Sequence, residues 1–197
     1  MIVPHQWAPL GRIALRIADS HQTNVDRAIE EALSQGLTVE LIAEAILQGI
    51  PYSGFPGAVE ALGSLRKLTG TPATDDADPR EPDRHDPPTS FCTVYGAQVE
   101  AVRASLTTLH PQLERWILNF AYGDVMERGK LPFPLVEGLA VASLIGQRRR
   151  TPLHSHLRGA LRAGWSQEQL ESWLELIEAD ADRPTIEFAR QIIRREA

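Results

Sequence analysis

The sequence aligns with itself, without a gap, at an offset of 128 positions. Each copy holds a helical apolar pattern, a Gly stop, a polar helix cap, a Pro break and a further helical pattern, in that order. Two amphipathic hairpins with a Gly stop could align by chance, but here the shared order holds over the full span. We therefore predict a duplication in which each copy has an apolar face that the other copy, or another subunit, must cover. The paired positions are Ala14 with Ala142, Ile17 with Ile145, Ala32-Leu33 with Ala160-Leu161, Gly36 with Gly164, Glu40 with Glu168, Pro56 with Pro184 and Ala61 with Ala189.

Apolar residues recur at helical spacing, and no segment shows sustained two-residue alternation. The pattern predicts an all-α fold of duplicated antiparallel helical hairpins. The second helix begins at Thr23 or Asn24 and stops at Gly36, and Thr38 caps the third. The other expected helices span residues 7–20, 39–50, 57–68, 91–109, 110–128, 134–149, 152–163, 166–179 and 184–195, with a break at 51–56.

The chain divides into three segments. Residues 1–68 form a first repeat, residues 69–90 a linker rich in Pro and Asp, and residues 91–197 a second repeat with preceding helices. The linker has almost nothing to bury, so it is expected to be a mobile or extended surface segment.

Composition excludes several classes of protein. Cys92 is the single cysteine of 197 residues, so an internal disulfide, a Cys-based zinc site and a Cys-x-x-Cys redox pair are all impossible. The formal charge of −6 argues against nonspecific nucleic-acid binding. There is no signal-peptide core and no apolar run near the ~18 residues of a membrane span, which favours a cytoplasmic protein without a membrane partner.

Three motifs carry a resemblance to a known family: Ala32-Leu33-x-x-Gly36-x-Thr38-x-Glu40, then Tyr52-x-Gly54-x-Pro56-x-Ala58, and Leu153-x-x-His156-x-x-x-Ala160-Leu161-x-x-Gly164-x-Ser166-x-Glu168. The sequence resembles the carboxymuconolactone decarboxylase family, which includes the AhpD-like alkylhydroperoxidases. The resemblance covers most of the chain apart from the linker, implies an AhpD-like helical bundle, and extends to Val94-Tyr95-Gly96, Tyr122-Gly123 and the position of Glu137.

The departures from the family pattern limit the chemistry. Arg149 and Pro152 stand where the peroxidase branch carries its two cysteines, so thiol peroxidase chemistry at that site is excluded. The first repeat is degenerate, with Pro9 opposite Glu137 and Ala28 opposite His156. The second repeat has Asp180 and Asp182 where the first has Tyr52 and Gly54, so each copy is expected to keep a different part of one site.

Glu137 and His156 are the candidate catalytic residues. If Thr151 caps the helix of His156 and Pro152 begins it, His156 lies near a helix N-terminus, where a bound anion and a neutral imidazole are favoured. On adjacent antiparallel helices, Glu137 would orient His156 or share its proton. The alternatives are a half-buried helix histidine bonded to backbone and an ordinary first-turn glutamate.

Arg149, Tyr52 and His154 are the candidate substrate-binding residues. Arg149 would clamp a carboxylate, although most Arg runs at helix ends are simply solvated. Tyr52 would donate to an oxyanion or merely fill a hairpin corner, and His154 points elsewhere on its helix than His156. No His or Asp cluster supports a metal site.

Together these features lead to one functional expectation and one alternative. We expect a cofactor-independent lyase or isomerase acting on a small carboxylated lactone or β-keto acid, with the resemblance implying a homo-oligomer, most simply a trimer. The alternative is a non-catalytic family member that serves as an oligomeric ligand-binding or assembly module.

Overall fold

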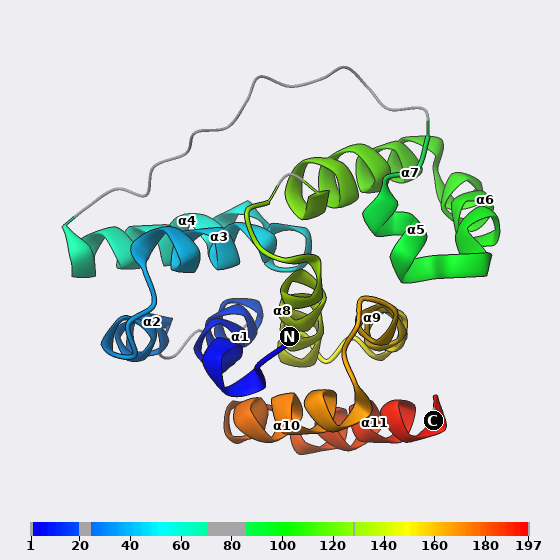
Figure 1. Ribbon diagram of the computed structural model, residues 1–197. Coiled ribbons are helices and arrows are strands. Elements are labelled where there is room, and N and C mark those ends of the chain that lie inside the picture. The colour runs from blue at the N-terminus through cyan, green and yellow to red at the C-terminus, as the bar shows by residue number, and fades with distance from the viewer. Residues whose placement is uncertain (1, 20–24, 71–85, 128, 197) are drawn as a thin grey trace.

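The computed structural model describes residues 2–19, 25–70, 86–127 and 129–196, and every regular element in these ranges is a helix (Figure 1). The all-α prediction is therefore confirmed. None of these helices is long and apolar enough to cross a membrane. The α-helices are α1 Pro4–Ala18, α2 Val25–Ser34, α3 Val39–Gln48, α4 Ile50–Thr69, α5 Thr89–Tyr95, α6 Val99–Leu109, α7 Pro111–Trp116, α8 Phe133–Gly146, α9 Arg150–Arg162, α10 Gln167–Ile177 and α11 Arg183–Arg195. Short 3₁₀ turns cover Gly96–Gln98 and Glu178–Asp180, and a π-helix, η2, covers Ile117–Glu127.

Helix α8 lies at the centre of the bundle, beside α1 and α9 (Figure 1). Every residue from Leu135 to Gly146 is buried, as expected for a helix that is apolar on all sides. Gly146 lets α1 approach, because a Cβ there would lie 2.5 Å from the carbonyl oxygen of Leu15. Glu137 is the one charged residue of this helix, and its side chain has no access to solvent.

Helices α1, α2 and α3 of the first half correspond in order to α8, α9 and α10 of the second half. Shifted by 128 positions, α8, α9 and α10 would begin at residues 5, 22 and 39, close to the starts of α1, α2 and α3 at residues 4, 25 and 39. Gly36 and Gly164 both have left-handed backbones, with φ of 84° and 104°. Thr38 and Ser166 both cap the next helix through their side chains, at 3.3 and 3.2 Å. The cap predicted at Thr38 is thus confirmed.

The break expected at 51–56 is present as a kink at Gly54, where φ of 74° and ψ of 171° depart from helical geometry and divide α4 into two helical pieces. Several other expected boundaries were wrong. The helix expected over 91–109 is divided at Gly96, and the one over 110–128 turns from α7 into η2. Thr69 ends α4 and Thr89 begins α5. The caps predicted at Thr23 or Asn24, and linker residues 71–85, lie outside the described residues.

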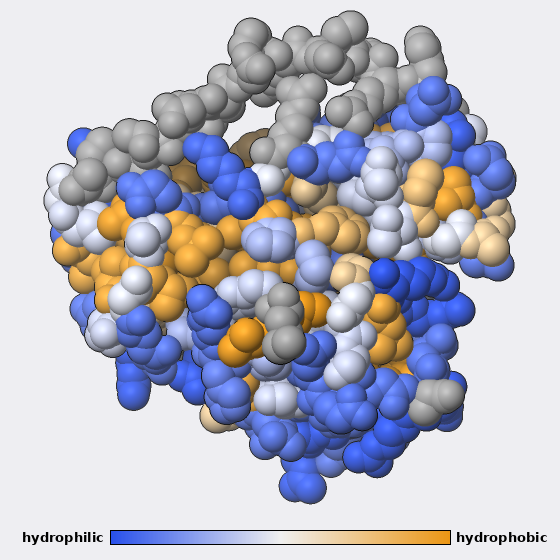
Figure 2. Space-filling model, in the orientation of Figure 1, coloured by the Kyte–Doolittle hydropathy of each residue, from blue (hydrophilic) through white to orange (hydrophobic). Residues whose placement is uncertain are grey.

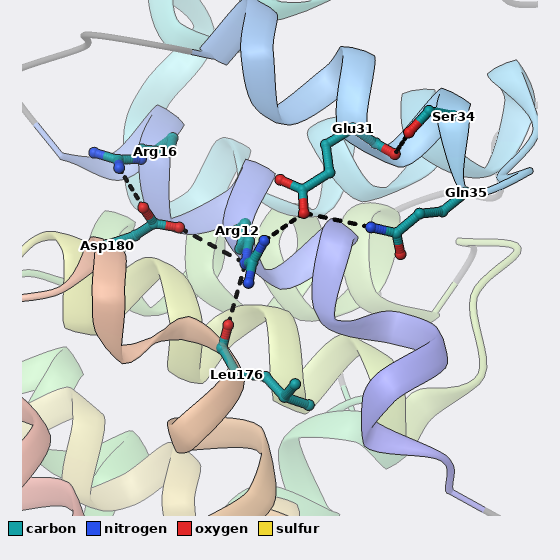
Figure 3. A network of polar contacts seen from close by, with 7 residues as sticks. All are labelled: Arg12, Arg16, Glu31, Ser34, Gln35, Leu176 and Asp180. Atoms are coloured by element: carbon teal, nitrogen blue, oxygen red, sulfur yellow. Dashed lines mark hydrogen bonds and ion pairs between the residues drawn. The ribbon is translucent and has the colours of Figure 1, made fainter.

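A polar network joins α1 to α2 and to the end of α10 (Figure 3). The guanidinium of Arg12 pairs with Glu31 and donates to the carbonyl oxygen of Leu176 at 3.1 Å. Arg16 pairs with Asp180, which also lies 3.8 Å from Arg12. All four charged side chains are partly exposed, so the network contributes only modestly to the stability of the packing between these helices.

Candidate functional site

Glu137 on α8 and His156 on α9 form a buried hydrogen-bonded pair. Their Oε2 and Nδ1 atoms lie 3.1 Å apart, and the residues are 0% and 5% exposed. The pair forms because α8 and α9 pack against each other, as expected of the antiparallel hairpin. With Nδ1–H donating to the carboxylate, Nε2 is the imidazole nitrogen left for a ligand.

Gly159 makes room for the carboxylate. It lies one turn after His156 on α9, and a Cβ at this position would lie 2.4 Å from Oε2 of Glu137 and 3.2 Å from Cγ2 of Val94. A side chain at residue 159 would therefore displace the acid from the histidine. The other carboxylate oxygen of Glu137, Oε1, is buried with no hydrogen-bond partner in the described structure.

The helix-start argument for His156 was wrong. Helix α9 begins at Arg150, with Arg149 at the N-cap position and no side-chain cap, so Thr151 lies inside the helix. His156 is the seventh residue of α9, well into its second turn. The field of a helix terminus is strong only within the first turn, so the acid partner, rather than the helix terminus, is the nearest influence on His156.

Tyr52 comes to the pair from the other half of the chain. Its ring lies edge-on against the imidazole of His156, with centroids 5.7 Å apart and an interplanar angle of 82°. The amide of Gln147 donates to the carbonyl oxygen of Tyr52, which holds this part of α4 against the end of α8. Burial of the hydroxyl, followed by the negative charge of Glu137 and by Tyr95, raises the pKa of Tyr52 well above its ordinary value.

Two further tyrosines, which sequence reasoning did not assign to the site, lie near Glu137. Tyr122 of η2 donates a hydrogen bond to the hydroxyl of Tyr95 on α5, at 3.3 Å. Burial is the largest cause of a raised pKa in both, and the charge of Glu137 also contributes in both. The signal was present in the Val94-Tyr95-Gly96 and Tyr122-Gly123 motifs, but their helices could not be placed beside α8 without the fold.

Arg149 and His154 are not drawn into this group by any described contact. Arg149 is exposed at the start of α9, and His154 is half-buried two residues before His156. The neighbours of Arg149 are engaged elsewhere: Arg148 lies 3.9 Å from Asp182, and Arg150 stacks on a ring of α11. The substrate-binding roles of Arg149 and His154 stay predictions.

The chemistry of these side chains suits proton transfer. Among the described residues no three His, Cys, Asp or Glu side chains gather as a metal site. A buried acid–imidazole pair with phenolic hydroxyls nearby offers a proton carrier, a group that orients it, and neutral donors for a developing oxyanion. Its members come from α4, α5, η2, α8 and α9.

The fold and the buried pair place the molecule among all-α bundles of the AhpD-like type. Residues 111–195 match the family model described as "Carboxymuconolactone decarboxylase family", a range that includes Glu137, His156 and Tyr122. The match confirms the family resemblance over this part of the chain. Tyr52 and Tyr95 lie before the matched range.

A curated relative matches over a longer stretch. "Peroxisomal protein 2" of Schizosaccharomyces pombe is 29% identical over 138 residues, covering 66% of this chain. The chain spans 64% of the length of that relative.

Proposed function

We propose that the protein is a cofactor-independent lyase or isomerase of the carboxymuconolactone decarboxylase type, acting on a small carboxylated lactone or β-keto acid. The observation that supports this best is the 3.1 Å contact between the buried side chains of Glu137 and His156. A charged residue on a wholly buried helix is costly to keep unless it is paired, so an acid here calls for an explanation. Orienting a proton carrier provides one.

In decarboxylation, the bond between the carboxylate carbon and its neighbour breaks, CO₂ leaves, and the electron pair moves onto the enolate oxygen. Tyr52 would donate a hydrogen bond to that oxygen. His156, with Nδ1–H held by Glu137, would deliver a proton from Nε2 to carbon and take another from solvent. In an isomerisation, the same nitrogen would take a proton from one carbon and return it to another. The half-buried Tyr52 marks the side from which a ligand would approach.

The test is CO₂ release from a panel of carboxylactones and β-keto acids. We expect His156→Gln and Glu137→Gln to lower kcat by about 10²–10⁴-fold, the usual contribution of general acid–base catalysis. His154→Gln is the matched control, since it makes the same change on the same helix outside the pair. Equal rates for wild type and His156→Gln, with both folded by circular dichroism, would remove His156 from the mechanism.

We further propose that the chain is a duplication that retains one composite site. The counterparts of Glu137, His156 and Tyr52 at the 128-residue offset are Pro9, Ala28 and Asp180. Asp180 is engaged by Arg12 and Arg16, and Glu31, the counterpart of Gly159, belongs to the same network (Figure 3). Ion pairs thus involve the counterparts of Tyr52 and Gly159, whereas the counterparts of Glu137 and His156 themselves, Pro9 and Ala28, cannot ionise.

We propose a homo-oligomer from the exposed apolar residues, and a trimer because the family resemblance implies one. Figure 2 shows a broad hydrophobic area over α3 and α4. On α4, Phe55 and Val59 are 62% and 68% exposed, and the Phe55 ring lies 5.8 Å from that of Phe120 on η2. Trp116 on α7 is likewise 62% exposed. Light scattering should give three times the chain mass, and Val59→Lys should lower it.

The near-complete burial of the pair favours one alternative, a non-catalytic binding or assembly module. At 5% exposure, His156 offers a substrate little direct access. On this alternative the wild type would release no CO₂ from any substrate, while Val59→Lys would still change the assembly.

The predicted cytoplasmic location also has an alternative, because the fission yeast relative is named as peroxisomal. Imaging of tagged chains distinguishes these compartments.

A further inference from the structure

All three tyrosines of the chain gather around the Glu137–His156 pair. They come from α4, α5 and η2, which are separate elements of the bundle. Tyr52 and Tyr95 are half-buried, whereas Tyr122 is 5% exposed. Tyr52 and Tyr95 are thus less enclosed by the fold than Tyr122.

The hydrogen bond between Tyr122 and Tyr95 has a direction. The hydroxyl of Tyr122 donates and that of Tyr95 accepts, at 3.3 Å. A hydroxyl that accepts one hydrogen bond still has its own proton to donate, so Tyr95 keeps a donor for another acceptor. Accepting a bond also makes that proton a better donor, because hydrogen bonds in a chain polarise one another.

The aromatic packing holds Tyr95 and Tyr122 in place. The Phe91 ring lies 4.6 Å from that of Tyr95 and 5.0 Å from that of Tyr122, with an 83° angle to the latter. Phe91 is itself fully buried. The guanidinium of Arg162 lies close to Gly96 and donates to the carbonyl oxygen of Val94, which joins the end of α5 to α9.

We propose that Tyr95 is a second substrate-contacting hydroxyl of this site, that Tyr122 positions it, and that Tyr52 and Tyr95 together bind the oxygen of a planar enolate. This inference rests on the proposed function and names the ligand class of the same site. Two donors to one oxygen suit an enolate, because the larger share of its delocalised negative charge lies on that oxygen. The surrounding rings suit a flat ligand.

The electrostatic surroundings agree with this role. Raised pKa values keep all three phenols protonated near neutral pH, so they donate hydrogen bonds to an anion rather than add negative charge. Glu137, the acid that contributes to these shifts, is paired with His156.

The test uses 4-nitrophenolate as an enolate mimic and 4-nitroanisole, which has the same ring without the anionic oxygen. Binding to the full chain is measured for wild type, Tyr95→Phe and Tyr122→Phe. Tyr95→Phe should weaken nitrophenolate binding by about 10- to 100-fold, the range for a hydrogen bond to a charged group, and leave nitroanisole within about 2-fold. The absorbance of bound nitrophenol also gives the pH midpoint of its ionisation, which should be lowest in wild type and higher in both variants.

Three results would overturn the inference. They are equal nitrophenolate affinity for wild type and Tyr95→Phe, an equal loss of both ligands, and no binding to wild type. A Tyr122→Phe variant that leaves the ionisation midpoint unchanged would remove Tyr122 as a positioning residue. The proposed reaction fails separately: a protein that releases no CO₂, yet binds nitrophenolate in a Tyr95-dependent way, supports the oxyanion site alone.

Discussion

The His156→Ala substitution should destabilise the fold chiefly by leaving Glu137 as an unpaired buried charge. The carboxylate has no exposure, its Oε2 atom bonds to His156 at 3.1 Å, and its Oε1 atom has no hydrogen-bond partner in the described structure. Removing one member of a buried pair costs about 3–5 kcal/mol. At about 2–4 °C per kcal/mol for a chain of this size, the Tm should fall by roughly 6–20 °C.

A second substitution isolates the charge. Glu137→Gln in the His156→Ala background replaces the ion with a neutral amide of nearly the same shape, whose unsatisfied burial costs only about 1–3 kcal/mol. The double variant should therefore recover about 2 kcal/mol relative to His156→Ala alone. The cavity left by the imidazole is the same in both, so it cancels from the comparison.

The measurement is urea denaturation followed by circular dichroism at one fixed protein concentration. His154→Ala is the control on the same helix, and it should change the free energy of unfolding by less than about 1 kcal/mol. The reasoning is refuted if Glu137→Gln brings no recovery in the His156→Ala background, or if His154→Ala costs as much as His156→Ala.

Three other predictions follow from the described contacts. Spectrophotometric titration should show no tyrosine ionising near pH 10, because all three pKa values are raised. The contribution of these tyrosines to the free energy of unfolding should be fully present below that pH and fall as pH rises above it, because the unfolded chain then releases protons that the folded chain holds. A titration curve with an ordinary tyrosine midpoint would contradict this. Gly159→Ala should lower the free energy of unfolding by about 1–3 kcal/mol, because the new Cβ clashes with Glu137. Gly63→Ala, with open space around its Cβ, should raise it by about 0.5–1 kcal/mol by stabilising α4. Equal urea midpoints for the two variants would contradict this prediction. Arg12→Met should lower stability by about 1 kcal/mol at low salt and by less in 1 M salt, because its ion pairs are partly exposed; a salt-independent loss would count against it.

Much of the local structure could be predicted from short-range chemistry. The cap at Thr38 is confirmed because the hydroxyl needs only the amide of Leu41, three residues away. The kink at Gly54 was less predictable. The pattern indicated a break, but whether a helix resumes after one turn depends on what packs against it, and α4 packs against α1, α2 and α3.

The sequence likewise predicted only part of the candidate site. The spacing of Glu137 and His156 suggested a pair on adjacent helices, and the 3.1 Å contact shows that they meet. The spacing could not reveal that His156 lies in the second turn of α9, because the helix start depends on the turn at Arg148, a non-glycine residue with φ of 57°. Nor could it bring Tyr95 and Tyr122 to Glu137, since those contacts join α5, η2 and α8.

The sequence by itself determined the all-α class, the order of the helices, the absence of a Cys-x-x-Cys pair and the likeness to one family. These follow from periodicity, caps and residue identity, which act over a few positions. Only the tertiary structure decided which residues surround the acid–base pair, that Gly159 gives Glu137 its space, and that Arg12, Arg16, Glu31 and Asp180 form ion pairs in the corresponding region of the other half. The physical reason is that burial and electrostatic pairing depend on distances across the whole bundle, which a linear pattern does not contain.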